Sequence, residues 1–342
     1  MKARWTLCLL SLTLVSCASK QKIAFQAIEP AQEHQVASIR TVAFDTFEKD
    51  RIGVSGVIEG ALGGYSLDGK KPYFQVVERK NLANILAEQQ LSSSWAVDPE
   101  QRIKVGKLVG AQGIFSGEVV SVTSSDAYRN ESRSRCAYHN KKGGCERYEE
   151  YTVSCQEKTY GVSILVKLVD TATGNYVFSN TFTESESYSK CPDGGSIPGG
   201  SEVLSSMLRK ISKDLIAKVA PTKYVLEVAL LDEIDDDNVE TSGKQEELFK
   251  SAFEFAKAGR VDKSLERFQK FGESVSWKSY VANYNYAVLL EAHGDLAEAE
   301  KYYKAADEIA VKPVPEINDG VKRIAARLEK GRQLASQLKE RE

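Results

Sequence analysis

Hydrophobic residues recur at two different spacings along the chain, and this predicts strands interleaved with helices. Short apolar runs with few charges predict strands at 39–47, 73–77, 114–122, 160–170, 176–183 and 224–231. Apolar residues three and four positions apart predict amphipathic helices at 51–62, around 82–86, at 99–109 and at 203–219. This order of elements predicts an α/β fold in which helices pack on a mixed sheet.

The strongest local signals surround the helix at 99–109. Asp98 is a residue type that caps helices, Pro99 suits the first turn, and Gly110 suits the left-handed position that ends a helix. We expect three apolar residues of this helix to be buried, namely Val105, Leu108 and Val109.

The C-terminal part carries an internal repeat. Five positions recur after 35 residues: Ala252, Gly259, Asp262, Ser264 and Phe268 become Ala287, Gly294, Ala297, Ala299 and Tyr303. Small residues suit helix contacts and glycine suits the turn, so the pattern resembles the tetratricopeptide family. The resemblance implies an all-α array of helical hairpins at 245–342, with the helix at 316–338 as a cap.

Arrays of this family usually bind a peptide or a partner protein in a concave groove. Lys250, Asn283 and Tyr284 are the candidates for such a groove. The alternative is that the tyrosines of this segment, Tyr284 among them, pack in the core or at its edge. For any one tyrosine this alternative is the stronger expectation.

The N-terminus has the layout of an export signal. Two cations precede a short apolar stretch, and small residues lead to Cys17. This resembles a bacterial lipoprotein signal at 1–16, which implies that Cys17 is lipidated and that the protein is anchored at the periplasmic face of the outer membrane. Residues 17–38 are polar and predict a tether, while the acidic run at 233–244 predicts a linker.

Composition limits the remaining chemistry. The 342 residues are enough for two domains, and a net charge of −2 gives no basic field for nucleic acid. Four cysteines remain after the signal and Cys17 are set aside: Cys136, Cys145, Cys155 and Cys191. An even number in an exported protein predicts disulfides, with three pairings open. Their spacing does not suit a zinc site.

The domain predicted at 39–232 resembles the curli production assembly/transport family, which is CsgG-like. The resemblance lies in VERKNL at 77–82, GKLVGA at 106–111 and the D-x-x-T-G turn at 170–174. It implies a non-catalytic outer-membrane lipoprotein, one that can form a homo-oligomer.

Pore-forming members of that family insert two hairpins per subunit into the membrane. The corresponding segments here are 123–160 and 183–201, which contain YRNESRSR and ESESYSK. Each charge facing mid-membrane lipid would cost about 2–4 kcal/mol. We therefore predict polar loops that stay in water, pinned by disulfides.

Nothing in the sequence indicates catalysis or a bound cofactor or metal. The three histidines, His34, His139 and His293, accompany no nucleophile motif, and no phosphate-binding glycine pattern is present. We therefore expect a lipoprotein that acts by protein–protein contact in the assembly or export of a surface structure. The alternatives are a subunit of a ring-forming secretion channel and an activator of a cell-wall enzyme.

Overall fold

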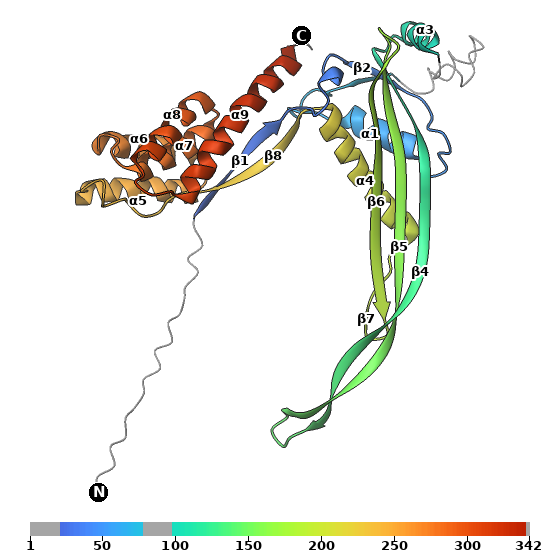
Figure 1. The fold of residues 1–342 in the computed structure, drawn as a ribbon, viewed down its shortest axis with the longest axis horizontal. Coiled ribbons are helices and arrows are strands. Elements are labelled where there is room, and N and C mark those ends of the chain that lie inside the picture. The colour runs from blue at the N-terminus through green and yellow to red at the C-terminus, as the bar shows by residue number, and fades with distance from the viewer. Residues whose placement is uncertain (1–20, 78–97, 340–342) are drawn as a thin grey trace. The chain divides into compact units, whose positions relative to one another are not determined.

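The computed structural model describes residues 21–77 and 98–339, which fall into two compact units (Figure 1). Of the described residues, the α/β unit comprises 28–77, 98–223 and 332–339, and the helical unit comprises 21–27 and 224–331. Within the part of the chain that the structure describes, no helix is long and apolar enough to cross a membrane.

The α/β unit is built on a six-stranded mixed sheet with the order β3-β2-β4-β5-β6-β7. Strand β2 (Thr41–Phe44) runs parallel to β3 (Gln75–Val77) on one side and to β4 (Gly113–His139) on the other. Strands β4, β5 (Cys145–Asp170), β6 (Tyr176–Cys191) and the short β7 (Gly194–Gly195) pair antiparallel in succession. The predicted mixed sheet is confirmed.

Helices lie on both faces of the body of this sheet. Phe44 and Phe115 point to the face covered by α1 (Val54–Gly64) and α4 (Gly200–Val219), where the main core forms. Ala43 and Ile114 are their neighbours in sequence, so they point to the opposite face. There they pack with Val105 of α3 (Pro99–Val109) in a smaller core.

Helix α3 begins and ends where its sequence signals predict. The Asp98 carboxylate accepts a hydrogen bond from the Glu100 amide at 3.0 Å, and Gly110 adopts a left-handed φ of 72°. Val105 is fully buried and Val109 packs beside it, but the prediction for Leu108 is wrong, since it is 44% exposed. The helix predicted around 82–86 lies outside the described residues.

The helical unit consists of paired antiparallel helices. Its elements are α5 (Gly243–Lys257), α6 (Val261–Ser274), α7 (Tyr280–His293), α8 (Leu296–Ile309) and α9 (Pro315–Lys339). Gly259 and Gly294 take positive φ in the turns between paired helices, at the repeated positions. The tetratricopeptide assignment itself stays a prediction.

The range 17–38, predicted as a tether, contains a strand, β1 (Lys22–Glu29), which pairs with β8 (Thr222–Ala229). Every second residue of β1 is buried, a period of two that we missed because the intervening Ala24 and Ile28 are apolar as well and blur the alternation. Ile23 and Phe25 join the core of the helical unit. A short 3-10 helix, η1 (His34–Val36), follows.

The acidic run is not a solvated linker, because it packs against α7. The Asp235 carboxylate is largely buried and accepts hydrogen bonds from the Ser279 hydroxyl and from the Tyr280 amide, the latter at 2.9 Å. The Asn285 side chain accepts from the Leu231 amide at 2.9 Å and donates to the Leu231 carbonyl at 2.7 Å. These hydrogen bonds hold the run against α7 in the helical unit.

Candidate functional site

The most prominent feature of the α/β unit is a hairpin that extends beyond the sheet body (Figure 1). The segments predicted as polar loops at 123–160 and 183–201 are mostly strand, because β4 and β5 stay paired from Gly113 opposite Asp170 to His139 opposite Cys145. Strand β6 follows β5 only as far as Lys190 opposite Gln156. The hairpin therefore has a three-stranded root and a two-stranded tip.

Two disulfides fix this hairpin. Cys136 is bonded to Cys145 and closes the tip, while Cys155 is bonded to Cys191 where the third strand ends. The predicted disulfides are present in the structure, which selects one of the three pairings. Cys155 is fully buried although it lies far along the hairpin.

A chain of ion pairs lies beside the Cys155–Cys191 disulfide. The Glu131 carboxylate contacts Arg129 at 2.6 Å and Arg133 at 2.8 Å, and Arg133 also contacts Asp193 at 2.9 Å. Hydrogen bonds from Arg133 and then Arg129 hold the pKa of Glu131 below its usual value. Glu131 and the two sulfurs lie close enough to share a metal ion. However, the sulfurs are bonded to each other and two guanidinium groups occupy the carboxylate, so this set does not suit a cation.

The closed tip presents aromatic and cationic groups to solvent. Tyr138 and Tyr148 are 59% and 67% exposed. Lys141, Lys142 and Arg147 are also exposed, and within the described ranges none of these three has an ion-pair partner. The turn itself is ordered by Asn140, whose side-chain oxygen accepts hydrogen bonds from the Lys142 and Gly144 amides, both at 2.9 Å.

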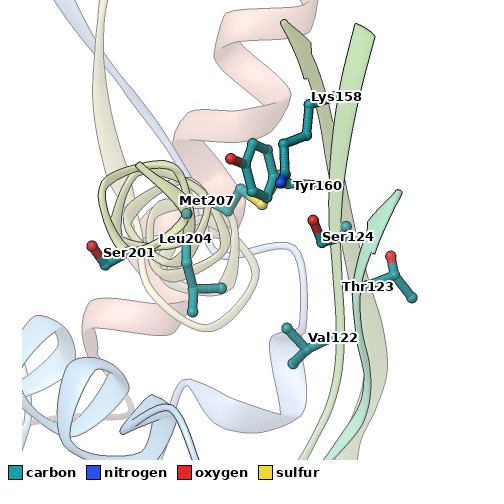
Figure 2. A pocket seen from close by; sticks show the side chains of 10 residues that line it. Val122, Thr123, Ser124, Lys158, Tyr160, Ser201, Leu204 and Met207 are labelled. Carbon is teal, nitrogen blue, oxygen red and sulfur yellow. The ribbon is translucent and has the colours of Figure 1, made fainter. Parts of the chain in front are cut away.

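A pocket of about 410 Å³ lies at the root of the hairpin, between the sheet and the first turns of α4 (Figure 2). Val122, Leu204 and Met207 give it an apolar lining. Its two largest polar side chains are already engaged: Tyr160 donates to the Pro198 carbonyl at 3.0 Å, and Lys158 lies 3.4 Å from Asp126. The pocket has no histidine or thiolate to activate a nucleophile, so its chemistry suits an apolar group and not a reaction.

Both long edges of the hairpin root are unpaired among the described strands. Strand β2 pairs with β4 only as far as Phe115, and a single bridge joins Glu48 to Glu118. On the other side, β7 pairs with β6 only at Lys190 and Cys191. Unpaired edges expose backbone donors and acceptors that a strand from another chain can satisfy.

Residues 69–201, which include this hairpin, match the family model of the Curli production assembly/transport component CsgG. This part of the chain is a CsgG-family domain. The match supports the resemblance seen in the sequence and ends close to the start of α4. CsgG-family proteins are assembly and transport components, not a class of enzymes. No curated protein matches the chain significantly.

Several solved structures resemble the chain over about half its length. Lipoprotein GNA1162 from Neisseria meningitidis is 13% identical, covers 51% of this chain and 99% of its own, and has a TM-score of 0.26. The LpoB C-terminal domain from Salmonella enterica is 10% identical, with coverages of 45% and 95% and a TM-score of 0.25. The PelC dodecamer from Paraburkholderia phytofirmans is 14% identical, with coverages of 58% and 98% and a TM-score of 0.26. Likeness at this level says nothing about function.

Outside the CsgG-family domain, the predicted partner-binding residues separate into two groups. Lys250 is exposed and lies 3.7 Å from Glu246 on the same helix, so it remains a candidate. The groove predictions for Asn283 and Tyr284 are wrong, since each is only 1% exposed. Asn283 donates to the Trp277 and Ser279 carbonyls, and Tyr284 donates to the Ala229 carbonyl at 2.8 Å.

The remaining predicted positions form no site. Cys17 lies outside the described residues, so its lipidation stays a prediction. His34 is in η1, His139 is at the hairpin tip and His293 ends α7. The features that sequence reasoning missed are the hairpin strands and the open edges. Their signal was a run of strand-favouring residues, such as Tyr151, Thr152 and Val153, among charged ones.

Proposed function

We propose that this protein is an outer-membrane-anchored periplasmic lipoprotein that acts by protein–protein contact in the assembly or export of a surface structure. The CsgG-family domain supports an assembly or transport role. The observation that carries the proposal is the polar hairpin with its disulfide-closed tip. Arg129, Glu131, Arg133 and Arg135 lie on one face, while Asn130, Ser132 and Ser134 lie on the other.

Neither face of the hairpin is suited to lipid. Turning the first face to lipid would bury four charges, each costing about 2–4 kcal/mol at the bilayer centre. On β4 the second face offers only hydroxyl and amide groups over the same span, and on β5 it carries the charge of Glu150, which lies opposite Ser134. A hairpin of this kind is better suited to an aqueous contact with another protein, where tyrosine and arginine are the favoured contact residues.

The closed tip is also suited to recognition for an energetic reason. A loop that is free in solution pays a cost when it is ordered on binding. The Cys136–Cys145 disulfide and the Asn140 turn order this loop before a partner arrives. Tyr138, Tyr148 and the three unpaired cations are then presented in one place, which favours an acidic protein surface as the target.

A second candidate, the ring-forming secretion channel subunit, is favoured by one observation. The edges of β4 and β6 are both open at the hairpin root, so copies could pair head to tail around a ring. A ring of this kind could equally serve a periplasmic scaffold. The difference between the two candidates is therefore whether the hairpins are in lipid.

A Cys17→Ala variant separates these candidates. We expect the variant to become soluble in the periplasm, since the lipid would be the anchor. A channel subunit would still fractionate with the outer membrane, and that result would refute the scaffold. Electron microscopy of detergent-extracted protein should in addition show no band of protein embedded in the detergent belt.

A further inference from the structure

A second surface of the α/β unit has the features of a docking groove. It lies between the outer sides of α1 and α4, has a volume of about 520 Å³, and includes Tyr65 and Leu67 from the segment after α1. Its floor is formed by Val57 and Ala61 of α1 and by Ile216 of α4. None of these residues belongs to the hairpin or to the pocket at its root.

The floor exposes an apolar residue that the fold itself does not use. Val54, Ile58 and Leu62 of α1 are at most 1% exposed, which completes the contact between this helix and the core. Val57 belongs to the same apolar pattern but is 37% exposed. It faces the groove, where a partner could cover it.

Beside this floor, helix α1 also has glycine positions, where no side chain covers the backbone. Gly60 and Gly64 are one helical turn apart, and a Cβ added to either would meet no atom within 4 Å. Gly60 costs the helix about 1 kcal/mol relative to alanine, and no contact with a described residue explains it. Small residues at such a position allow another helix to approach closely.

Three cations stand on the rim without partners. Arg209 and Lys213 are one turn apart on α4, and Lys223 is the second residue of β8. Within the described residues the side chains of these three make no ion pair or hydrogen bond. The other lysines of α4 are different: Lys210 contacts Glu186, and Lys218 donates to Gln32 at 2.9 Å. The two cations of α4 that line the groove, Arg209 and Lys213, are therefore left unpaired, while Lys210 and Lys218 have partners.

We propose that this groove docks an acidic amphipathic helix of a partner protein. Two antiparallel or crossing helices present a groove into which the ridge of a third helix packs. An apolar face of the incoming helix would cover Val57, Ala61 and Ile216, and carboxylates beside that face would meet Arg209, Lys213 and Lys223. The proposal depends on the proposed function in one respect: it takes the partner to be a protein.

The chain's own acidic run is an unsuitable occupant. Asp235 in that run is already hydrogen-bonded inside the helical unit. A nearby carboxylate, Asp68, is likewise engaged, by the Lys70 and Lys71 amides at 2.8 and 3.1 Å. Among the described residues neither carboxylate forms an ion pair with Arg209, Lys213 or Lys223, so these cations can pair with carboxylates from another molecule.

The test measures binding of a synthetic peptide to the full chain by fluorescence anisotropy. The peptide is an amidated helix of about 15 residues, with leucines on one face and glutamates along both borders of that face. A control peptide has lysine in place of every glutamate. We expect the acidic peptide to bind at least tenfold more tightly than the basic one, and its affinity to fall as salt is raised.

Variants then place the binding in the groove. R209E/K213E should weaken the acidic peptide about tenfold or more, because two attractions become repulsions. V57Q should weaken both peptides by removing floor contacts, and since Val57 is exposed the chain should still fold. K107E, which changes an exposed lysine on α3, is the matched control and should have little effect.

Three results would overturn the proposal. These are equal binding of the two peptides, unchanged binding to R209E/K213E, and no binding of the acidic peptide at millimolar concentration. A K141E/K142E variant at the hairpin tip separates this groove from the proposed function. It should leave peptide binding intact even if contact with the assembly partner is lost.

Discussion

Glu291 is the most completely buried charged side chain of the helical unit, and we expect its replacement to destabilise that unit strongly. Its carboxylate has no exposed surface. Oε1 accepts from Arg327 Nη1 at 2.9 Å and from Arg323 Nε at 3.1 Å, while Oε2 accepts from Arg323 Nη2 at 3.0 Å and from the Tyr303 hydroxyl at 2.6 Å. Burial raises the pKa of Tyr303, so the hydroxyl remains a donor.

The expected loss of unfolding free energy follows from the groups that E291Q leaves without a partner. Glutamine has nearly the same shape, but it offers one acceptor oxygen where the carboxylate offered two. Its amide group would face guanidinium donors, and the charges of Arg323 and Arg327 would be left only 20% and 13% exposed with no counter-charge. Removing one partner of a buried ion pair typically costs about 3–5 kcal/mol. Against a domain stability of about 5–15 kcal/mol, this is a large share.

The assay is urea unfolding of the full chain, followed by circular dichroism and by tryptophan fluorescence. Trp277 packs against Tyr286 and Tyr302 in this unit, and a W95F background reduces the signal from elsewhere in the chain. The matched control is E298Q, because Glu298 pairs with Lys301 at 2.6 Å but is 44% exposed. An exposed pair contributes at most about 1 kcal/mol. Equal effects of E291Q and E298Q would refute the reasoning, as would a loss below about 1 kcal/mol for E291Q.

Two further predictions concern the α/β unit. A reductant should lower the stability of this unit, while EDTA should not. From the length of the loop that each disulfide closes, C155A/C191A should cost about 4 kcal/mol of unfolding free energy and C136A/C145A about 2.5 kcal/mol. Unfolding by EDTA alone, measured by thermal denaturation, would contradict the disulfide assignment. Asp50 caps α1 by accepting from the Val54 amide and from the Ser55 amide and hydroxyl. Burial raises its pKa, but the hydrogen bonds from Ser55, Val54 and Ile52 together outweigh this and lower the pKa overall. A lowered carboxylate pKa stabilises the fold at pH above about 4, and that contribution is lost as the pH falls through the folded-state value. D50A should cost about 1 kcal/mol at neutral pH and less in acid, and a constant cost across a pH series of urea titrations would contradict this.

The elements that were predicted well are those whose signals are local. Helix α3 is an example, because Asp98, Pro99 and Gly110 act through their own backbone geometry and need no partner from elsewhere. The helix predicted at 203–219 was equally clear, and Leu208, Ile211 and Leu215 form the buried stripe of α4. Its period of 3.6 residues can be read from a single segment.

The elements that were missed depend on distant pairing. The outer half of β4 is a strand because β5 continues the same ladder of backbone hydrogen bonds, not because one face is apolar. Both of its faces are polar there, so the period of two in hydrophobicity that normally marks a strand is absent. The disulfide pairing was open for the same reason: only the register places Cys155 beside Cys191.

The helical unit differs from our expectation in a way that bears on where partners bind. Every residue of α7 from Val281 to Glu291 is buried, so this helix has no face open to a peptide. The chain's own segment 229–235 is hydrogen-bonded along it. Tyr284 and Asn285 donate to the backbone carbonyls of Ala229 and Leu231, and the Ser279 hydroxyl donates to the Asp235 carboxylate. A partner would have to displace those bonds before it could use the same surface. Contacts through α7 are therefore disfavoured. The recognition features that remain accessible are Lys250 on α5 and, in the α/β unit, the closed tip and the groove between α1 and α4.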